Sequence, residues 1–253
     1  MITQIYEIQT PEEAEAVGAV GVDHIGSVVL AAEKWRQPEL RETIQRVRDI
    51  KKKSTLITLF NDPDTVCKAL DYYQPDIIHF CEMLPGGREG MGICRRLIAL
   101  QEIIRQRYPG LKIMRSIPIE RTSGSNSMGT LALAEQFQPT SDFFLTDTVL
   151  TNGHDMAAQP VAGFVGITGE TCHWDTARML VNQATIPVIL AGGLSPENVY
   201  RGVCTVKPAG VDSCTRTNRE NNEGIPIRFQ KDVARVKRFV DEARRAAADI
   251  AEG

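Results

Sequence analysis

The chain has 253 residues, a formal net charge of −3 and a sequence pI near 5.9. Hydrophobic residues make up 42% and charged residues 24%, which is ordinary usage for a globular chain and excludes compositional disorder. A weakly acidic chain without a concentrated basic face is not a general nucleic-acid binder. Any phosphate that it binds is therefore expected on a small molecule.

The six cysteines are scattered without a C-x-x-C pair, which predicts reduced thiols and neither a zinc site nor a disulfide framework. Residues 1–18 run directly into a strand-like segment and an acidic helix, without the regions of a signal peptide. No apolar stretch reaches the ~18 residues of a membrane span. We therefore expect a cytoplasmic monomer or homodimer without a metal, a cofactor or a membrane partner.

Strand-like and helix-like segments alternate along the sequence. Thr10 and Pro11 supply an N-cap and a first helical residue after the first strand, and the acidic Glu12 and Glu13 suit the helix dipole. The expected strands are residues 2–8, 23–30, 54–60, 76–82, 111–119, 142–150, 186–193 and 211–215. The further expected helices are residues 39–52, 62–73, 92–108, 127–137, 174–183, 195–203 and 231–252.

This alternation predicts a parallel sheet covered by helices, and eight units favour closure into a (β/α)8 TIM barrel over an open, doubly wound sheet. Closure requires residues 2–8 to pair with residues 211–215. No linker divides the chain, so we expect residues 1–253 to form a single domain. Glycine-rich segments at residues 85–92, 122–129 and 152–169 each follow a strand and are expected to form ligand-binding loops at the C-terminal face.

Several motifs are similar to those of one enzyme family. IPVILAGGLSPENV from residue 186 matches a seventh strand–helix unit, and LTDT at residues 145–148 is similar to Leu-Leu-Asp-Thr. GITGETCHWD at residues 166–175 looks like a Gly-Gly-Thr-Gly loop followed by Phe-Asp-Trp, and KDVARVKRFV from residue 231 matches a final helix. GVDSCTRTN from residue 210 stands in place of Gly-Val-Asp and a Ser-Ser-Gly phosphate loop, and QIYEIQTPEEA from residue 4 in place of Lys-Ile-Cys-Gly-Ile. The chain thus resembles the phosphoribosylanthranilate isomerases of tryptophan biosynthesis.

The resemblance implies an Amadori rearrangement, in which a carboxylic acid protonates the ribose ring oxygen and a cysteine thiolate removes a proton from the adjacent carbon. Asp147 occupies the position of the acid, Tyr6 that of the thiolate, and Gln4 that of the preceding lysine. A phenol with a pKa near ~10 is a poor base at neutral pH. We therefore expect weak or altered isomerase activity, with Cys81, Glu82 or an activated Tyr6 as the substitute base.

Alternation along the strands predicts which side chains face the barrel interior near its C-terminal mouth. The predicted set is Tyr6, Ile8, His79, Cys81, Arg115, Leu145, Asp147, Asp212 and Cys214. Each has a structural alternative: a cysteine in a strand is commonly a small buried hydrophobe, and a histidine there is commonly a hydrogen-bonded core residue. A carboxylate such as Asp147 can simply cap backbone amides. Cys172, His173 and Asp175 lack the spacing of metal ligands.

Substrate-binding residues are expected at two glycine-rich or basic loops. Gly192 and Gly193 precede a helix start, where backbone amides can approach a phosphate, although a tight turn alone would also require glycine. The partner loop contains Cys214, Thr215 and Arg216. The arginine replaces a glycine and could clamp the phosphate or block its seat, and we favour the clamp. Arg36 is a candidate for the aglycone carboxylate, with an exposed loop arginine as the alternative.

Three functions fit these observations. The first is a phosphoribosylanthranilate-type isomerase that keeps Asp147 as its acid. The second is a lyase or isomerase of another sugar phosphate on the same barrel, and the third is a non-catalytic binder of a phosphorylated ligand. Retention of LTDT and AGGLSPENV favours an enzyme.

Overall fold

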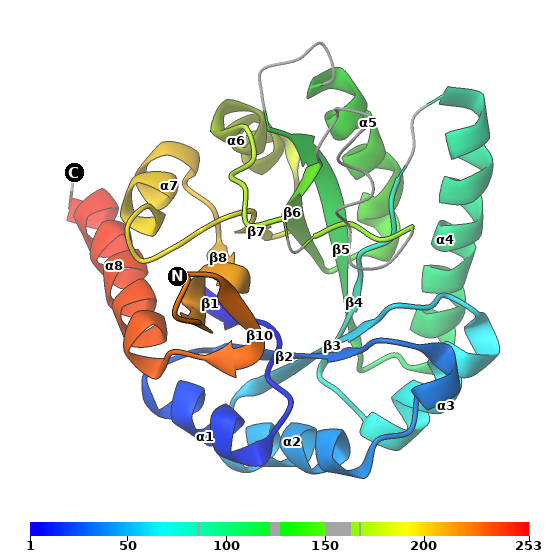
Figure 1. Ribbon diagram of the computed structural model, residues 1–253. Coiled ribbons are helices and arrows are strands. Elements are labelled where there is room, and N and C mark those ends of the chain that lie inside the picture. Colours follow the sequence, from blue (N-terminus) through cyan, green and yellow to red (C-terminus); the bar gives the residue numbers. More distant parts are fainter. Residues whose placement is uncertain (85–86, 122–126, 150–162, 167, 253) are drawn as a thin grey trace.

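The computed structural model describes residues 1–84, 87–121, 127–149, 163–166 and 168–252. Its central sheet is a closed barrel of eight parallel strands in sequence order, surrounded by helices (Figure 1). The first strand pairs with the eighth, Ile2 with Gly210 and Ile5 with Ser213. This pairing closes the barrel and confirms the predicted (β/α)8 fold.

The elements follow the predicted alternation. The barrel strands are β1 (Ile2–Ile5), β2 (His24–Val29), β3 (Lys53–Thr58), β4 (Ile77–Phe80), β5 (Lys112–Glu120), β6 (Phe143–Val149), β7 (Val188–Leu190) and β8 (Gly210–Ser213). The α-helices are α1 (Pro11–Ala19), α2 (Pro38–Asp49), α3 (Pro63–Tyr73), α4 (Gly87–Arg107), α5 (Ser127–Phe137), α6 (Trp174–Gln183), α7 (Val199–Val206) and α8 (Val233–Glu252). Short 3-10 turns are η1 (Ala32–Lys34), η2 (Gln138–Thr140) and η4 (Thr215–Thr217), and a hairpin is formed by β9 (Asn218–Glu220) and β10 (Pro226–Lys231).

Local sequence fixes where several helices begin. Thr10 caps α1 by accepting a hydrogen bond from the backbone N–H of Glu13, and Asp62 caps α3 in the same way. Each cap is followed by a proline at the first helical position, where its missing N–H costs nothing. These starts set how far each loop can extend over the mouth of the barrel.

Apolar side chains form two layers. The larger layer lies between the strands and the helices and includes Ile5, Ile25, Val188 and Phe239. The smaller layer fills the barrel interior with Tyr6, Val28, Ile77, Met114, Leu145, Ile189 and Ala191. Polar side chains complete the interior, since Gln4 donates a hydrogen bond to Asp212 and lies 3.2 Å from His24 Nδ1. The interior is therefore a packed core below the mouth, as barrels require.

Two predicted interior residues point the other way. On β5 it is Met114 and Ser116 that face inward, so Arg115 faces the helices, where its guanidinium lies 4.7 Å from the centre of the Phe137 ring. Ile8 packs in the outer layer because Glu7 has a φ of +64°, which interrupts the strand alternation. The prediction for these two side chains was wrong, whereas the other seven line the pocket described below.

Several predicted boundaries also shift. β1 ends at Ile5 and β8 at Ser213, so Cys214 and Thr215 belong to the following turn. β7 is reduced to Val188–Leu190, α7 begins at Val199 and α4 begins at Gly87. Lys231, predicted to start the last helix, ends β10, and the hairpin β9–β10 was not predicted at all. Residue 150 lies outside the described residues, and so do residues 85–86, 122–126, 152–162 and 167 of the glycine-rich segments after β4, β5 and β6.

Candidate active site

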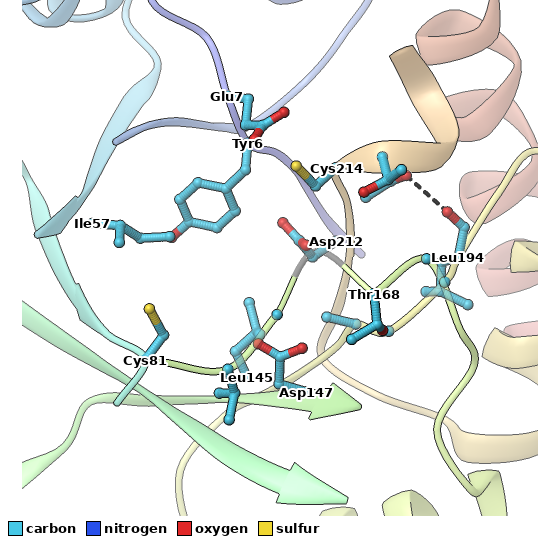
Figure 2. A pocket seen from close by; sticks show the side chains of 18 of the residues that line it. Tyr6, Glu7, Ile57, Cys81, Leu145, Asp147, Thr168, Leu194, Asp212 and Cys214 are labelled. Carbon is cyan, nitrogen blue, oxygen red and sulfur yellow. Dashed lines mark hydrogen bonds between the residues drawn. The ribbon is translucent and has the colours of Figure 1, made fainter. Parts of the chain in front are cut away.

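A pocket opens at the carboxyl ends of the barrel strands, with a cavity of about 90 Å³. Its described lining comes from β1, β2, β3, β4, β6, β7, β8 and the turns that follow them. The wall near β2 and β3 is apolar, formed by Val28, Ile57 and Leu59. Figure 2 shows Tyr6, Asp147 and Asp212 directed into this space, with Cys81 and Cys214 at its edges.

Tyr6 occupies the inner end of the pocket and is held by a hydrogen-bonded chain. Its hydroxyl lies 2.6 Å from Nδ1 of His79, whose Nε2 lies 2.9 Å from the hydroxyl of Ser116. Burial lowers the pKa of His79 to about 3, with the Arg115 charge adding to the effect, so the imidazole is neutral. Burial, followed by the charge of Asp212, raises the pKa of Tyr6 well above its usual value. Tyr6 is therefore a neutral phenol at physiological pH.

Gly26 makes room for the tyrosine. A Cβ atom built at Gly26 on β2 would overlap the Tyr6 ring, so the phenol stacks directly on the glycine backbone. Gly26 is thus a determinant of the site that sequence reasoning missed, and its position two residues after the interior-facing His24 was the available signal.

Asp147 projects from β6 at the position predicted for the acid. Its Oδ1 accepts a hydrogen bond from the backbone N–H of Thr148 at 2.9 Å. A Cβ atom at Gly166, which has a φ of +117°, would lie 2.9 Å from Oδ2 of Asp147, so this glycine lets the loop close onto the carboxyl group. Burial raises the pKa of Asp147 to about 7. The group can therefore be protonated and act as an acid near neutral pH.

Asp212 is a second carboxyl group in the same pocket, on β8, with 6% of its surface exposed. Its Oδ1 accepts a hydrogen bond of 3.1 Å from Nε2 of Gln4, its partner in the strand register. Burial raises the pKa of Asp212 to about 7, and the charge of Asp147 adds to the rise. The pocket thus contains two carboxyl groups that titrate in the same range.

The two thiols of the pocket are protonated. Burial raises the pKa of Cys81 well above its usual value, and the charges of Glu82 and Asp147 raise it further. Burial also raises the pKa of Cys214. Glu82, considered as a substitute base, faces the helices and accepts a hydrogen bond of 2.5 Å from Nη1 of Arg115. The structure therefore does not bring Glu82 into the pocket.

The expected phosphate end of the pocket is formed by turns after β7 and β8. Gly192 and Gly193 have φ angles of +92° and +56°, and a Cβ atom at Gly193 would lie 2.6 Å from the carbonyl carbon of Glu170. Nε and Nη2 of Arg216 donate to the carbonyl oxygen of Gly169 at 3.0 and 2.8 Å. Glycine is thus required here both for the turn and for the close approach of the preceding loop.

Arg216 also borders a polar hollow together with Gly193, Ser195 and Arg235. Its side chain is exposed and hydrogen-bonded to the carbonyl oxygen of Gly169, so the guanidinium lies at the edge of the expected phosphate-binding site. Thr215 and Cys214 line the pocket beside it. Gly192, Gly193, Cys214, Thr215 and Arg216 are therefore brought together, as the sequence predicted.

Arg36 is not brought to the pocket. It is exposed after β2, and its guanidinium lies 5.1 Å from the centre of the Tyr72 ring on α3. Arg41 approaches the same ring at 4.9 Å. Arg36 is thus a surface arginine stacked on an aromatic ring. The structure agrees with the alternative given above, an exposed loop arginine, and not with a role in binding a substrate carboxylate.

The hairpin β9–β10 reaches the rim of the site beside β1 (Figure 1). Nε and Nη2 of Arg228 donate to Oε1 of Glu7 at 2.7 and 2.5 Å, and Lys231 donates to the carbonyl oxygen of Cys214 at 2.8 Å. These contacts hold Glu7 in its left-handed conformation directly after Tyr6. The signal in the sequence was the turn-forming run NNEG followed by IPIRF.

Two absences hold for the described residues. They contain no group of three or more histidine, cysteine, aspartate or glutamate side chains that could hold a metal ion. They also contain no helix that is both long enough and apolar enough to cross a membrane. The fold and the pocket together define a (β/α)8 barrel with a candidate acid–base centre at its C-terminal mouth.

Comparisons with known proteins identify the family. The sequence profile described as N-(5'phosphoribosyl)anthranilate (PRA) isomerase matches residues 111–242, slightly more than half of the chain. The N-(5'-phosphoribosyl)anthranilate isomerase of Methanosarcina acetivorans is 24% identical over 244 residues, which cover 95% of this chain and 92% of the relative. That of Haloferax volcanii is 40% identical over 120 residues, 47% of this chain and 46% of the relative. The chain belongs to the phosphoribosylanthranilate isomerase family.

Solved structures agree on the fold. N-(5'-phosphoribosyl)anthranilate isomerase from Pyrococcus furiosus superimposes with a TM-score of 0.66 at 22% identity, covering 97% of this chain and 99% of that one. A phosphoribosyl anthranilate isomerase in complex with reduced 1-(o-carboxyphenylamino)-1-deoxyribulose 5-phosphate gives a TM-score of 0.64 at 16% identity, covering 96% and 99%. At these identities the likeness concerns the barrel architecture.

Proposed function

We propose that this protein is an isomerase that converts a phosphorylated aldose carrying an amine substituent into the corresponding ketose by an Amadori rearrangement. The observation that carries the proposal is Asp147, half-buried in the pocket near the end of β6 with a pKa of about 7. A carboxylic acid that is half protonated at neutral pH suits the first step. It donates its proton to the ring oxygen while the bond between carbon 1 and that oxygen breaks.

The second support is the arrangement of the mouth. The turns at Gly192–Gly193 and at Thr215–Arg216 lie on one side of the pocket, and the apolar wall of Val28, Ile57 and Leu59 includes residues of β2 and β3. A phosphate at the glycine turns would leave the sugar over the two carboxyl groups and its substituent toward the apolar wall. The names of the relatives make phosphoribosylanthranilate the first substrate to test.

A second candidate is an isomerase or lyase of a different sugar phosphate. Tyr6 favours it, because the phenol occupies the inner end of the pocket where the family's cysteine would leave space. Arg36, stacked on Tyr72, is also not available in this arrangement for a carboxylate on the substrate. A non-catalytic binder of a phosphorylated ligand is the third candidate, and the two titrating carboxyl groups argue for chemistry instead.

The test is a direct assay with phosphoribosylanthranilate generated in situ, comparing wild type with Asp147→Asn. Turnover by the wild type that falls at least about 100-fold in the variant supports the proposal. If the wild type shows no turnover, a thermal-shift screen of sugar phosphates separates the second and third candidates from an empty scaffold. A ligand at a hundred times its dissociation constant stabilises the fold by ~2.7 kcal/mol.

A further inference from the structure

We propose that Asp212 is the general base of this barrel, the group that takes the proton from carbon 2 of the sugar after Asp147 has opened the ring. The proposal rests on the proposed isomerase function and names the residue that replaces the thiolate expected at the position of Tyr6. Three observations support it: the position of Asp212 in the pocket, the hydrogen bonding of its two carboxyl oxygens, and the protonation and hydrogen bonding of the other titratable side chains in the described pocket.

The position of Asp212 suits a base. It is an interior residue of β8 that lines the pocket, and its carboxyl group points into the same space as that of Asp147 (Figure 2). Gln4 donates a hydrogen bond to Oδ1, and Gln4 is itself oriented by His24, so this amide holds the carboxyl group in one orientation. Within the described chain Oδ2 has no hydrogen-bond partner. One oxygen is thus anchored while the other remains available to a substrate.

The aromatic groups of the pocket cannot take the proton. Tyr6 is a neutral phenol whose oxygen lies in a hydrogen bond with His79, and the nearby carboxylates disfavour its ionised form. His79 is neutral, but its two ring nitrogens are both engaged, one with Tyr6 and the other with Ser116. Its pKa of about 3 also makes it a very weak base.

The thiols are equally unsuited. A thiol reacts as a base only when it is ionised, and burial raises the pKa of both Cys81 and Cys214. Neighbouring carboxylates act in the same direction, Glu82 on Cys81 and Glu7 on Cys214.

Three carboxyl groups remain in the described lining: Glu7, Asp147 and Asp212. Both oxygens of Glu7 are engaged, since Oε1 accepts hydrogen bonds from Arg228 and Oε2 accepts one from the backbone N–H of Phe229. Asp212 is therefore the carboxyl group that keeps an oxygen open to the pocket and is not assigned to ring opening.

The chemistry balances with these two groups. Asp147 gives its proton to the ring oxygen, the bond between carbon 1 and that oxygen breaks, and the amine nitrogen forms a double bond to carbon 1. Oδ2 of Asp212 then takes the proton of carbon 2, the C–H electrons form a double bond between carbons 1 and 2, and the C=N electrons return to nitrogen. The enol loses its hydroxyl proton and carbon 1 gains one, which gives the ketose without an external oxidant or reductant.

The experiment compares wild type with Asp212→Asn, Asp212→Ala and Asp147→Asn on phosphoribosylanthranilate, with Asp71→Asn at the opposite end of the barrel as the control. Asp212→Asn should lower kcat at least about 100-fold. Asp212→Ala leaves space for a small carboxylate, so added formate should restore a measurable part of its activity. Formate should not rescue Asp212→Asn, whose amide fills that space. Calorimetry with reduced 1-(o-carboxyphenylamino)-1-deoxyribulose 5-phosphate, the analogue bound in the solved relative, measures the dissociation constant of each variant. This constant should change less than tenfold in both Asp212 variants, which separates loss of chemistry from loss of the fold.

The outcomes are distinguishable. Wild-type turnover that Asp212→Asn retains within about threefold overturns the role of Asp212 and leaves the proposed function standing. An inactive Asp212→Ala variant that binds the analogue normally but regains no activity with formate also overturns the role of Asp212 and leaves the proposed function standing. Absence of wild-type turnover overturns the proposed function itself, and with it this assignment. Loss of kcat in Asp212→Asn with rescue of Asp212→Ala supports both.

Discussion

The hydroxyl of Tyr6 lies 2.6 Å from Nδ1 of His79, and both buried side chains line the pocket together with the carboxyl groups of Asp147 and Asp212. This bond joins β1 to β4 and continues to Ser116 on β5. It makes the tyrosine a packed, hydrogen-bonded part of the interior instead of a side chain at the rim. The position that the family resemblance assigns to a reactive thiolate is thus occupied by a group with a structural anchor.

The first prediction concerns Tyr6→Cys. The substitution removes the ring from the inner end of the pocket and restores the residue type of the family, so activity on phosphoribosylanthranilate should rise. Complementation of a tryptophan auxotroph that lacks the isomerase measures it, with wild type, Tyr6→Cys and Asp147→Asn at equal expression. Robust growth with the wild type that Tyr6→Cys does not improve would contradict the expectation that the tyrosine limits activity.

The second prediction tests the packing of Tyr6 on Gly26. Since a Cβ atom at Gly26 would overlap the ring, Gly26→Ala should destabilise the wild type by about 1–3 kcal/mol. In the Tyr6→Cys background the same alanine meets no ring, and its cost should fall below about 1 kcal/mol. Urea unfolding of the four proteins gives the coupling energy. Equal costs in the two backgrounds would show that the ring and the glycine are independent.

The third prediction is the pH dependence of turnover. The acid must be protonated and the base ionised, so activity should rise and then fall through the two apparent pKa values of the Asp147–Asp212 pair, with an optimum near pH 7. Around Asp212, burial raises the pKa values of Tyr6 and Cys214, so neither ionises near that pH, and the charge of Lys231 opposes the rise in the pKa of Asp212. A plateau of kcat/KM from pH 6 to pH 9 would contradict a carboxyl pair.

The fourth prediction follows from the same carboxyl group and concerns stability. The pKa of Asp212 is about 7 in the fold and near ~3.9 when unfolded, so the native state binds more protons and loses stability as the pH rises from about 4 to 7. Asp212→Asn removes this penalty and should raise Tm by several degrees at pH 8, with little effect at pH 4. Thermal unfolding across this range measures it. A gain that is the same at every pH would show that the buried charge is not its cause.

The sequence was sufficient for the barrel and for most of the pocket. Alternation and the family motifs placed Tyr6, His79, Cys81, Asp147 and Asp212 at the mouth because each stands at an interior position near the end of a strand. The predicted inward orientation was wrong for Arg115. On the face of β5 that packs against the helices, its guanidinium is paired with Glu82 and stacked on the Phe137 ring, and these partners satisfy its charge. No periodicity distinguishes the two faces in such a case.

Other features depend on contacts between distant segments. Glu7, two residues after the end of β1, has a left-handed conformation, and its carboxylate is bound by Arg228, more than two hundred residues later. Arg36 follows β2 as expected, but the ring of Tyr72 on α3 fixes where its guanidinium lies. The space that Gly26 gives to Tyr6 is likewise a property of two strands. Local propensity carries no information about such partners.

The last prediction decides whether Arg216 clamps or blocks the phosphate seat. Its Nε and Nη2 are bonded to the carbonyl oxygen of Gly169, and the guanidinium stands beside Gly193 and Arg235. If it clamps, Arg216→Ala should raise KM for a sugar phosphate by about tenfold or more with little change in kcat, because a charge-assisted hydrogen bond to phosphate is lost. Arg107→Ala, an exposed arginine at the other end of the barrel, should leave both constants unchanged.

Steady-state kinetics of Arg216→Ala with the substrate that the assay identifies, repeated with its dephosphorylated form, measures the effect. A lower KM in Arg216→Ala would instead mean that the side chain blocks the seat, and that the ligand approaches the glycine turns once the arginine is gone.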